Sequence, residues 1–199
     1  MKRLLGERLV LEPVNVTNAV TLWRIMQTGH LREYQDVPRY TREEFERRVA
    51  SRPKAFDTRA IGRFEWLVVV RSTKRAIGWL SLRVGDHERR TAEIGYSIVS
   101  SERGQGYAGE AARLIVEYAF EASDLRELSA CCVPANIASR RLLASAGFLE
   151  RRVQRNGAIV RGRPIDIVIF ELGRERYRAR HDHGKSANSI VIPASANPK

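Results

Sequence analysis

Glycine and arginine are concentrated in segment 103–109, Arg-Gly-Gln-Gly-Tyr-Ala-Gly, which is the part of the sequence best suited to binding a ligand. The segment follows a strand-like run over 92–99 and precedes a helix-like run over 110–122. Glycine lets a backbone come close to an anion, and the first N–H groups of a helix have no partner inside the helix. Because these groups and the positive end of the helix dipole attract negative charge, the pattern predicts a phosphate or pyrophosphate site.

Three kinds of phosphate-binding loop can be compared with this segment. A P-loop requires Gly-Lys-Ser or Gly-Lys-Thr, which occurs only at residues 184–186, after no strand. A dinucleotide-binding loop requires Gly-x-Gly-x-x-Gly, a spacing that the segment satisfies, and Asp124 and Glu127 lie near the expected acidic position. Such a loop, however, belongs to the first strand and helix of a parallel sheet, whereas a long stretch of strand- and helix-like sequence precedes this one.

The third kind of loop has the pattern Arg-x-x-Gly-x-Ala, which residues 103–108 match. This motif resembles the coenzyme A loop of the GNAT superfamily of N-acetyltransferases. Segment 136–148, which begins Asn-Ile-Ala-Ser and ends Gly-Phe, is similar to the Asn-x-x-Ser…Gly-Phe helix of the same family. Residues 93–96, Glu-Ile-Gly-Tyr, and residues 118–120, Tyr-Ala-Phe, frame the loop as in the branch that contains the ribosomal-protein alanine N-acetyltransferases. The resemblance extends over roughly residues 7–173.

The resemblance implies an α+β fold with a mixed, mostly antiparallel sheet of six to seven strands, a splayed parallel pair in its middle and helices on both faces. We expect one N-acetyltransferase domain over residues 7–176 and a flexible basic and polar tail over 177–199, because the composition changes there.

Local patterns predict the elements that position the loop. The strands are expected at residues 9–13, 66–70, 76–82, 92–99, 128–133, 149–154 and 165–172. The helices are expected at residues 18–27, 41–51, 110–122 and 136–146, the second beginning with a Thr41-Glu44 capping box. Because a helix separates strands 92–99 and 128–133, these two are expected to be parallel.

The family's reaction transfers an acetyl group directly from acetyl-CoA to an amine, and the resemblance implies no metal. It assigns Ile98 and Val99 to the pantetheine arm and the thioester. It assigns the pyrophosphate to the backbone N–H groups of Arg103, Gly104, Gln105, Gly106, Tyr107, Ala108 and Gly109. Asn136 would bond the pantetheine from the far side of the gap between the strands. The same residue also suits a helix N-cap, and both roles can hold together.

Two proton transfers accompany this reaction, because the acceptor amine must lose a proton and the leaving thiolate must gain one. Glu93 is the first candidate base, since its carboxylate lies on the strand that leads to the cofactor and can receive a proton through water. A structural hydrogen-bonding role is the alternative for Glu93. Asp166 on the late hairpin and His87 in the preceding turn are further candidates, with solvated or structural roles as their alternatives.

The candidate acid departs from the family pattern. Many members carry a tyrosine seven residues after the helix asparagine, and here that position is Leu143. Ser139, three residues after Asn136, matches a serine that the ribosomal-protein branch places near the sulfur. The alternative for Ser139 is a plain hydroxyl in the first turn of a helix. A thiol leaving group has a pKa near 8.5 and needs little help, so the missing phenol does not exclude catalysis.

Composition limits the class of protein. No apolar run approaches the roughly 18 residues of a membrane helix, and the first residues lack the apolar core of a signal peptide. Cys131 and Cys132 are adjacent on an expected strand, so their side chains point to opposite faces and a mutual bond would be strained. We therefore expect two buried free thiols and a reducing, cytoplasmic location without membrane contact.

The formal net charge is +12. A positive surface attracts polyanions such as coenzyme A, RNA, ribosomes or acidic peptides, and a highly cationic substrate fits it poorly. The leading interpretation is an acetyl-CoA-dependent N-acetyltransferase that acts on a protein or peptide α-amine, such as a ribosomal or other protein N-terminus. A small-molecule amine acetyltransferase for an antibiotic, amino acid or polyamine is the second, and a non-catalytic RNA- or ribosome-binding module is the third. Monomer and dimer both stay open.

Overall fold

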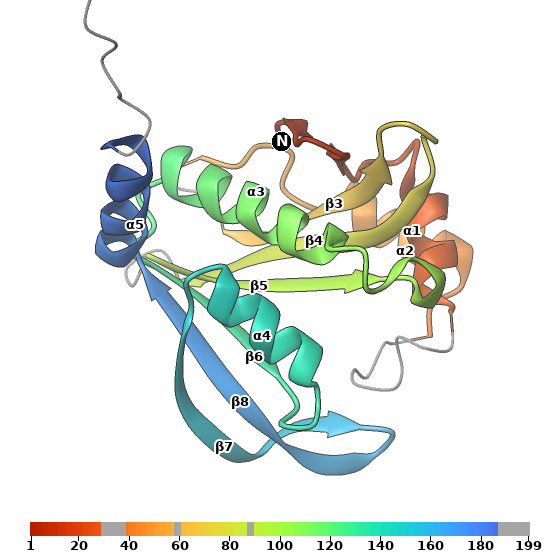
Figure 1. The fold of residues 1–199 in the computed structure, drawn as a ribbon. Helices are drawn as coiled ribbons and strands as arrows, with labels where there is room; N and C mark the ends of the chain where they lie inside the picture. The colour runs from red at the N-terminus through yellow and green to blue at the C-terminus, as the bar shows by residue number, and fades with distance from the viewer. Residues whose placement is uncertain (29–38, 58–60, 87–89, 187–199) are drawn as a thin grey trace, which may run out of the picture.

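The computed structural model describes residues 1–28, 39–57, 61–86 and 90–186. These residues form one sheet with helices on both of its faces (Figure 1). The strands are β1 (Leu4–Leu5), β2 (Leu9–Pro13), β3 (Gly62–Val70), β4 (Ala76–Asp86), β5 (Thr91–Ile98), β6 (Glu127–Cys132), β7 (Leu149–Val160) and β8 (Arg163–Gly173). The helices are α1 (Ala19–Met26), α2 (Arg42–Ala50), α3 (Tyr107–Glu121), α4 (Ile137–Ser145) and α5 (Arg174–Ser186).

The strands lie in the order β1-β2-β3-β4-β5-β6-β8-β7. All neighbours are antiparallel except β5 and β6, which are parallel as their connection through α3 requires. The expected α+β class and the central parallel pair are thus confirmed. The described part of the sheet has eight strands rather than six or seven, because the first residues add the two-residue strand β1 at the edge of β2.

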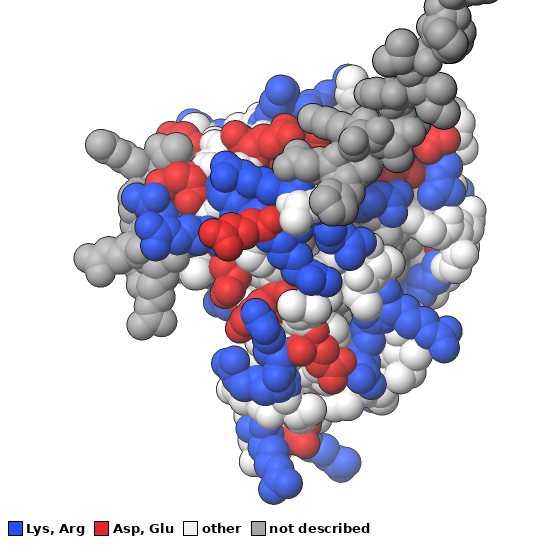
Figure 2. All heavy atoms as spheres, turned by 60° about the vertical axis from the view of Figure 1, so that its left-hand side comes forward, with Lys and Arg blue, Asp and Glu red and all other residues white. Residues whose placement is uncertain are grey.

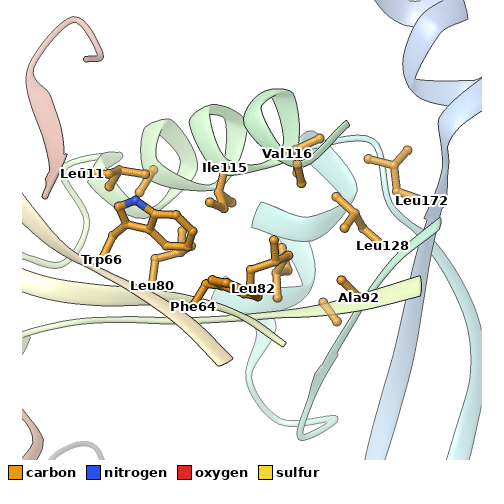
Figure 3. Close-up of a cluster of buried hydrophobic side chains, with 14 of the residues drawn as sticks. Leu11, Phe64, Trp66, Leu80, Leu82, Ala92, Ile115, Val116, Leu128 and Leu172 are labelled. Atoms are coloured by element: carbon orange, nitrogen blue, oxygen red, sulfur yellow. The ribbon is translucent and has the colours of Figure 1, made fainter. Parts of the chain in front are cut away.

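The main core lies between α3 and the sheet, where alternate residues of the strands point toward the helix (Figure 3). Phe64, Trp66, Leu80 and Leu82 of β3 and β4 are fully buried, and Ile115 of α3 packs against them. Helix α4 covers the same face and contributes its own buried side chains to this core. The loop before α3 is therefore carried by the best-packed helix of the molecule.

Helices α1 and α2 cover part of the opposite face, over β3 and β4 (Figure 1). Leu22 of α1 and Phe45 of α2 pack there against Leu67 and Trp79. The expected capping box is present, since the Thr41 hydroxyl accepts from the Glu44 N–H and the Glu44 carboxylate accepts from the Thr41 N–H. This second cluster is smaller than the first, and among the described residues no helix of this cluster packs on β5, β6, β7 or β8.

Residues 174–186 form helix α5, where the sequence predicted that a flexible tail begins at residue 177. Several side chains hold this helix to the domain, among them Tyr177, Arg174 and Arg176, whose Nε donates to the carbonyl oxygen of Gly147 at 3.0 Å. The Tyr177 ring is 9% exposed and lies 5.0 Å from the Phe120 ring. Arg174 donates to the carbonyl oxygens of Phe120, Ser123 and Leu125 at 2.6, 2.7 and 2.7 Å. The remaining residues are largely polar, so the sequence shows no apolar period that predicts the helix. Residues 187–199, the rest of the predicted tail, lie outside the described residues.

The prediction that both cysteines are buried is wrong. Cys131 is exposed, Cys132 is half-buried, and both are free thiols. The two side chains do point to opposite faces of β6, but only the face of Cys132 is covered by helices. None of the helices in the described segments is long and apolar enough to cross a membrane.

Candidate active site

Strands β5 and β6 pair over only three residues each. Thr91, Ala92 and Glu93 align with Glu127, Leu128 and Ser129. Beyond this point no backbone pairing joins the two strands in the described structure, although β5 continues to Ile98 and β6 to Cys132, and the strands diverge (Figure 1). Backbone N–H and C=O groups on this edge of β5 are thus available to a ligand, because each such group requires a hydrogen-bond partner.

The glycine loop ends beside this divergence. Gly104 and Gly106 have φ angles of 78° and 79°, in the left-handed region that favours glycine. Gly106 is the N-cap of α3, and no side chain caps the helix. Helix α3 begins at Tyr107, earlier than predicted, so the last three residues of the loop form its first turn and direct their N–H groups outward. This is the geometry of an anion-binding helix N-terminus.

An ion pair that the sequence analysis did not find fixes the loop to the start of β2. Arg8 donates through Nε to Glu110 Oε2 at 3.0 Å and through Nη1 to the carbonyl oxygen of Gln105 at 2.9 Å. Its guanidinium also lies 4.9 Å from the centre of the Tyr107 ring. The partners are 102 residues apart in the sequence, and no local pattern joins them.

Glu110 is the buried member of this pair, with its side chain 8% exposed. Its Oε1 accepts from the backbone N–H groups of Arg8 and Leu9 at 2.8 and 3.0 Å. Burial opposes ionisation, but the hydrogen bonds from Arg8 and Leu9 outweigh it and lower the pKa of the Glu110 carboxyl. A charged Glu110 in the first turn of α3 therefore holds β2 and the loop together.

Three other predicted cofactor residues have defined surroundings. Ile98 is buried with its side chain in the main core, so only its backbone faces the divergence of the strands. Its carbonyl oxygen accepts from Arg103 Nε at 3.3 Å, which holds the Arg103 side chain against β5. Val99 is half-buried, and its N–H donates to the carbonyl oxygen of Ile77 at 2.8 Å.

Helix α4 places two predicted residues on the other side of the divergence. Asn136 is the N-cap, and its Oδ1 accepts from the Ser139 N–H at 3.1 Å, so the capping role is confirmed. Ser139 Oγ lies 2.8 Å from Tyr96 Oη. Leu143, at the position of the family's phenol, is fully buried in the core.

Tyr96 is a candidate site residue that the sequence analysis missed. It lies on β5, on the face that packs against the main core, and its hydroxyl reaches α4. Burial raises the pKa of Tyr96 to about 12, against a smaller opposing effect of the Ser139 hydroxyl. The alternation of β5 was the available signal, since it places Tyr96 on the same face as the buried Ile94 and Ile98.

Glu93, the first candidate base, points to the opposite face of β5. Its Oε2 accepts from Arg83 Nη2 at 2.6 Å, and its side chain is 41% exposed. The candidate acid and base thus lie on the two sides of the sheet, next to the place where β5 and β6 separate. Asp166 accepts from the Asn156 N–H at 3.0 Å within the β7–β8 hairpin, a structural contact. His87 lies outside the described residues.

On the face that Figure 2 shows, charges of both signs are intermixed. Figure 2, viewed from the side of α5, shows basic side chains intermixed with acidic ones, with further basic groups on the lobe at the bottom that the β7–β8 hairpin forms. Several arginines are neutralised by neighbours, as in the pair of Arg151 with Glu171 at 2.8 Å. Within the described segments, no three His, Cys, Asp or Glu side chains are grouped in a way that could hold a metal ion.

An open mixed sheet that separates at one parallel pair, beside an uncapped helix after a glycine loop, defines an α+β domain of the anion-binding class. The acetyltransferase (GNAT) domain family matches residues 8–149, and the chain belongs to this family. It is an N-acetyltransferase of the GNAT type.

Individual relatives agree on this family and differ in their acceptors. An uncharacterised N-acetyltransferase, p20, of Bacillus licheniformis is 27% identical over 89% of this chain and 99% of its own length. The ribosomal-protein-S5-alanine acetyltransferase of Vibrio fischeri shares the fold with a TM-score of 0.76, at 18% identity over 88% of this chain and 98% of that one. A spermidine N-acetyltransferase chimera from Vibrio cholerae and hSSAT has a TM-score of 0.74, at 16% identity over 86% of this chain and 99% of that one.

Proposed function

We propose that this protein transfers the acetyl group of acetyl-CoA to the N-terminal α-amine of a protein or peptide. The observation that carries the proposal is the uncapped N-terminus of α3, which follows two left-handed glycines and opens beside the unpaired edge of β5. These features fit a diphosphate with a long amide-containing arm, because one part requires free N–H groups and the other requires an unpaired strand edge.

The cofactor residues keep the roles that the resemblance implied. The N–H groups of residues 103–109 receive the pyrophosphate, and the backbone of Ile98 and Val99 lies along the pantetheine. The amide nitrogen of Asn136 remains as a donor toward the arm, since its oxygen caps α4. Bound acetyl-CoA supplies an activated acyl group. The chain's own residues orient this group and assist the two proton transfers.

The acetyl transfer forms a C–N bond and breaks a C–S bond. Glu93 accepts, through water, the proton that the attacking amine loses, and Arg83 holds the carboxylate in place. Ser139 donates a hydrogen bond on the side of the departing sulfur. The released thiolate then takes its proton from water, because a thiol with a pKa near 8.5 is mostly protonated at pH 7. The separation of these residues on opposite faces of β5 lets the amine approach from one side while the sulfur leaves toward the other.

The α-amine is favoured over a lysine because less free energy is needed to keep it neutral. An α-amino group has a pKa of about 7.7–8.0, so keeping it neutral at pH 7 requires only about 1–1.4 kcal/mol. A lysine side chain, with a pKa of about 10.4, requires about 4.6 kcal/mol. A half-exposed carboxylate such as Glu93 suits the smaller demand better. The fold shared with an alanine N-acetyltransferase agrees with this choice.

A polyamine is the second candidate, because the spermidine enzyme has a comparable fold. The net charge of +12 disfavours it, since like charges repel an approaching polycation. A non-catalytic nucleic-acid module is disfavoured by the glycine loop, which such a protein would not need.

The test measures release of free thiol from acetyl-CoA in the presence of alanine- or serine-initiated peptides, the same peptides with a blocked N-terminus, and spermidine. We expect turnover with the free peptides alone. Turnover with spermidine instead would show the second candidate to be correct. Absence of acetyl-CoA binding in calorimetry would support the non-catalytic module and refute both enzymatic candidates.

A further inference from the structure

One hydrogen bond joins the two sides of the β5–β6 divergence. Tyr96 Oη on β5 lies 2.8 Å from Ser139 Oγ on α4, beyond the last paired residues of the two strands. The residues are 43 positions apart in the sequence, so this contact depends on the tertiary fold.

Further contacts fix the positions of both Tyr96 and Ser139. Tyr96 is paired with Leu80 of β4 and packs against the main core, which defines the direction of its ring. The Ser139 N–H is held by Asn136 Oδ1 at 3.1 Å, which fixes the first turn of α4. The Ser139 hydroxyl therefore has a fixed oxygen position, with the Tyr96 phenol and the Cys132 thiol as its neighbours.

The phenol is neutral at neutral pH, because burial raises the pKa of Tyr96 to about 12. A neutral phenol can donate its one hydrogen to Ser139 Oγ, and the hydroxyl of Ser139 then keeps its own hydrogen for another acceptor. The half-buried thiol of Cys132 on β6 also hydrogen-bonds Ser139. Burial raises the pKa of this thiol more than the bond with Ser139 lowers it, so the thiol also stays neutral.

We propose that Tyr96 is a positioning residue that donates to Ser139 and so directs the Ser139 hydrogen toward the departing sulfur. This inference rests on the proposed function. It provides, from β5, the phenol that the family pattern places on α4 and that Leu143 replaces here. The bonds that form and break remain those of acetyl transfer, and Tyr96 neither gains nor loses a proton.

The pKa values of the Tyr96 phenol and of a thiol distinguish hydrogen bonding to the sulfur from proton transfer to it. A thiol has a pKa near 8.5, and a phenol with a pKa of about 12 is therefore a poor proton source for a thiolate, by more than about a thousandfold. Stabilisation of the sulfur by an oriented Ser139 hydrogen is consistent with this difference, whereas a relay that ionises Tyr96 is not.

The first test uses Tyr96→Phe, which keeps the ring and its packing, together with Ser139→Ala and the double variant. We expect Tyr96→Phe to lower kcat about tenfold and to leave the KM for acetyl-CoA within about twofold, because one oriented donor is lost. The double variant should be no slower than Ser139→Ala, because Tyr96 acts through Ser139. Independent, multiplicative losses would overturn the inference.

Tyr118→Phe is the matched control. Tyr118 is a partly buried tyrosine of α3 whose ring packs against Phe56 and Trp66, away from Ser139. Removal of the Tyr118 hydroxyl should leave kcat unchanged within about twofold. A tenfold loss in this variant as well would mean that any buried tyrosine hydroxyl is needed for the fold, and would overturn the assignment to Tyr96.

A second measurement needs no acceptor amine and no turnover. Calorimetry compares the affinity of each variant for coenzyme A and for desulfo-coenzyme A, which lacks the sulfur. We expect the wild-type protein to prefer coenzyme A, and Tyr96→Phe and Ser139→Ala to reduce that preference by similar factors, with Tyr118→Phe unchanged. Binding with an unaltered preference would overturn the inference alone, whereas no binding by the wild-type protein would overturn the proposed function with it.

Discussion

The two faces of the sheet beside β5 are built differently. On the face of α3 and α4, the candidate cofactor site is made of backbone geometry held by buried contacts, such as the bond from Leu9 N–H to Glu110 at 3.0 Å. On the opposite face, Glu93 is half-exposed, its partner Arg83 is 61% exposed, and Cys131 is open to solvent. Trp79 on that side has a buried Nε1–H without a partner in the described structure. The candidate cofactor side is thus specified by the fold, while the proposed acceptor side depends on surface side chains.

The largest effect is expected for Gly106→Val. A branched residue at φ 79° is strained, and its side chain would meet Arg8 Nη2, which lies 3.3 Å from a Cβ at this position. We expect affinity for coenzyme A to fall at least about 100-fold, or about 2.8 kcal/mol, with the fold retained. Calorimetry and thermal unfolding measure the two quantities. Gly85→Val is the control, because a Cβ at Gly85 meets nothing within 4 Å. Unchanged affinity of Gly106→Val would show that the loop is misassigned.

Glu110→Ala tests whether the cofactor side is held by buried contacts. We expect a loss of about 2 kcal/mol in the free energy of unfolding, because the N–H groups of Arg8 and Leu9 lose their acceptor. Since the folded pKa of Glu110 is lowered, its contribution is complete above the unfolded pKa of about 4.3 and disappears as the pH falls through the folded value. Urea unfolding at pH 7 and pH 3 measures this.

The matched control for Glu110 is Glu117→Ala, an exposed carboxylate on the same helix. It should change stability by no more than about 0.5 kcal/mol. An equal loss in both variants would contradict a special role for the buried carboxylate.

Glu93→Gln tests the acceptor side. We expect turnover to fall about tenfold at pH 7, with a larger factor at lower pH, because more of the amine is then protonated and must lose its proton. Asp166→Asn should retain the wild-type rate profile, since Asp166 bonds the Asn156 N–H in the distal hairpin. Steady-state rates from pH 6 to 9 distinguish the two, and an identical profile for Glu93→Gln would remove it as the base.

The smallest effect is expected for Cys131→Ser. The thiol is exposed, so its replacement should change the free energy of unfolding by less than about 0.5 kcal/mol. Chemical denaturation measures this change. A loss of 2 kcal/mol would mean that this face is covered and would weaken the contrast between the two sides.

The sequence predicts the elements around the candidate cofactor site well because their signals are local. Glycine spacing, the strand-like run over 92–99 and the capping box at Thr41 each require only a few neighbouring residues. These signals led to the correct fold class, the parallel pair and the family. The role of Asn136 as a helix cap follows from the same kind of signal.

The missed features all join distant parts of the chain. The Tyr96–Ser139 bond spans 43 residues and the Arg8–Glu110 bond spans 102, and each requires the completed sheet. Helix α5 depends on one buried aromatic ring and on arginines that bond distant carbonyl groups, and these residues leave no periodic pattern. Sequence periodicity reports which face of an element is buried, and it does not report which side chain of another element meets it.

The contact of Arg174 with the end of α3 also determines when that helix end receives its partner during synthesis. The carbonyl oxygen of Phe120 receives its guanidinium donor from a residue made 54 positions later. Until Arg174 has been added and has left the ribosome, water must satisfy the carbonyl groups at this helix end. The glycine loop is therefore translated well before the end of the helix that it begins receives this partner.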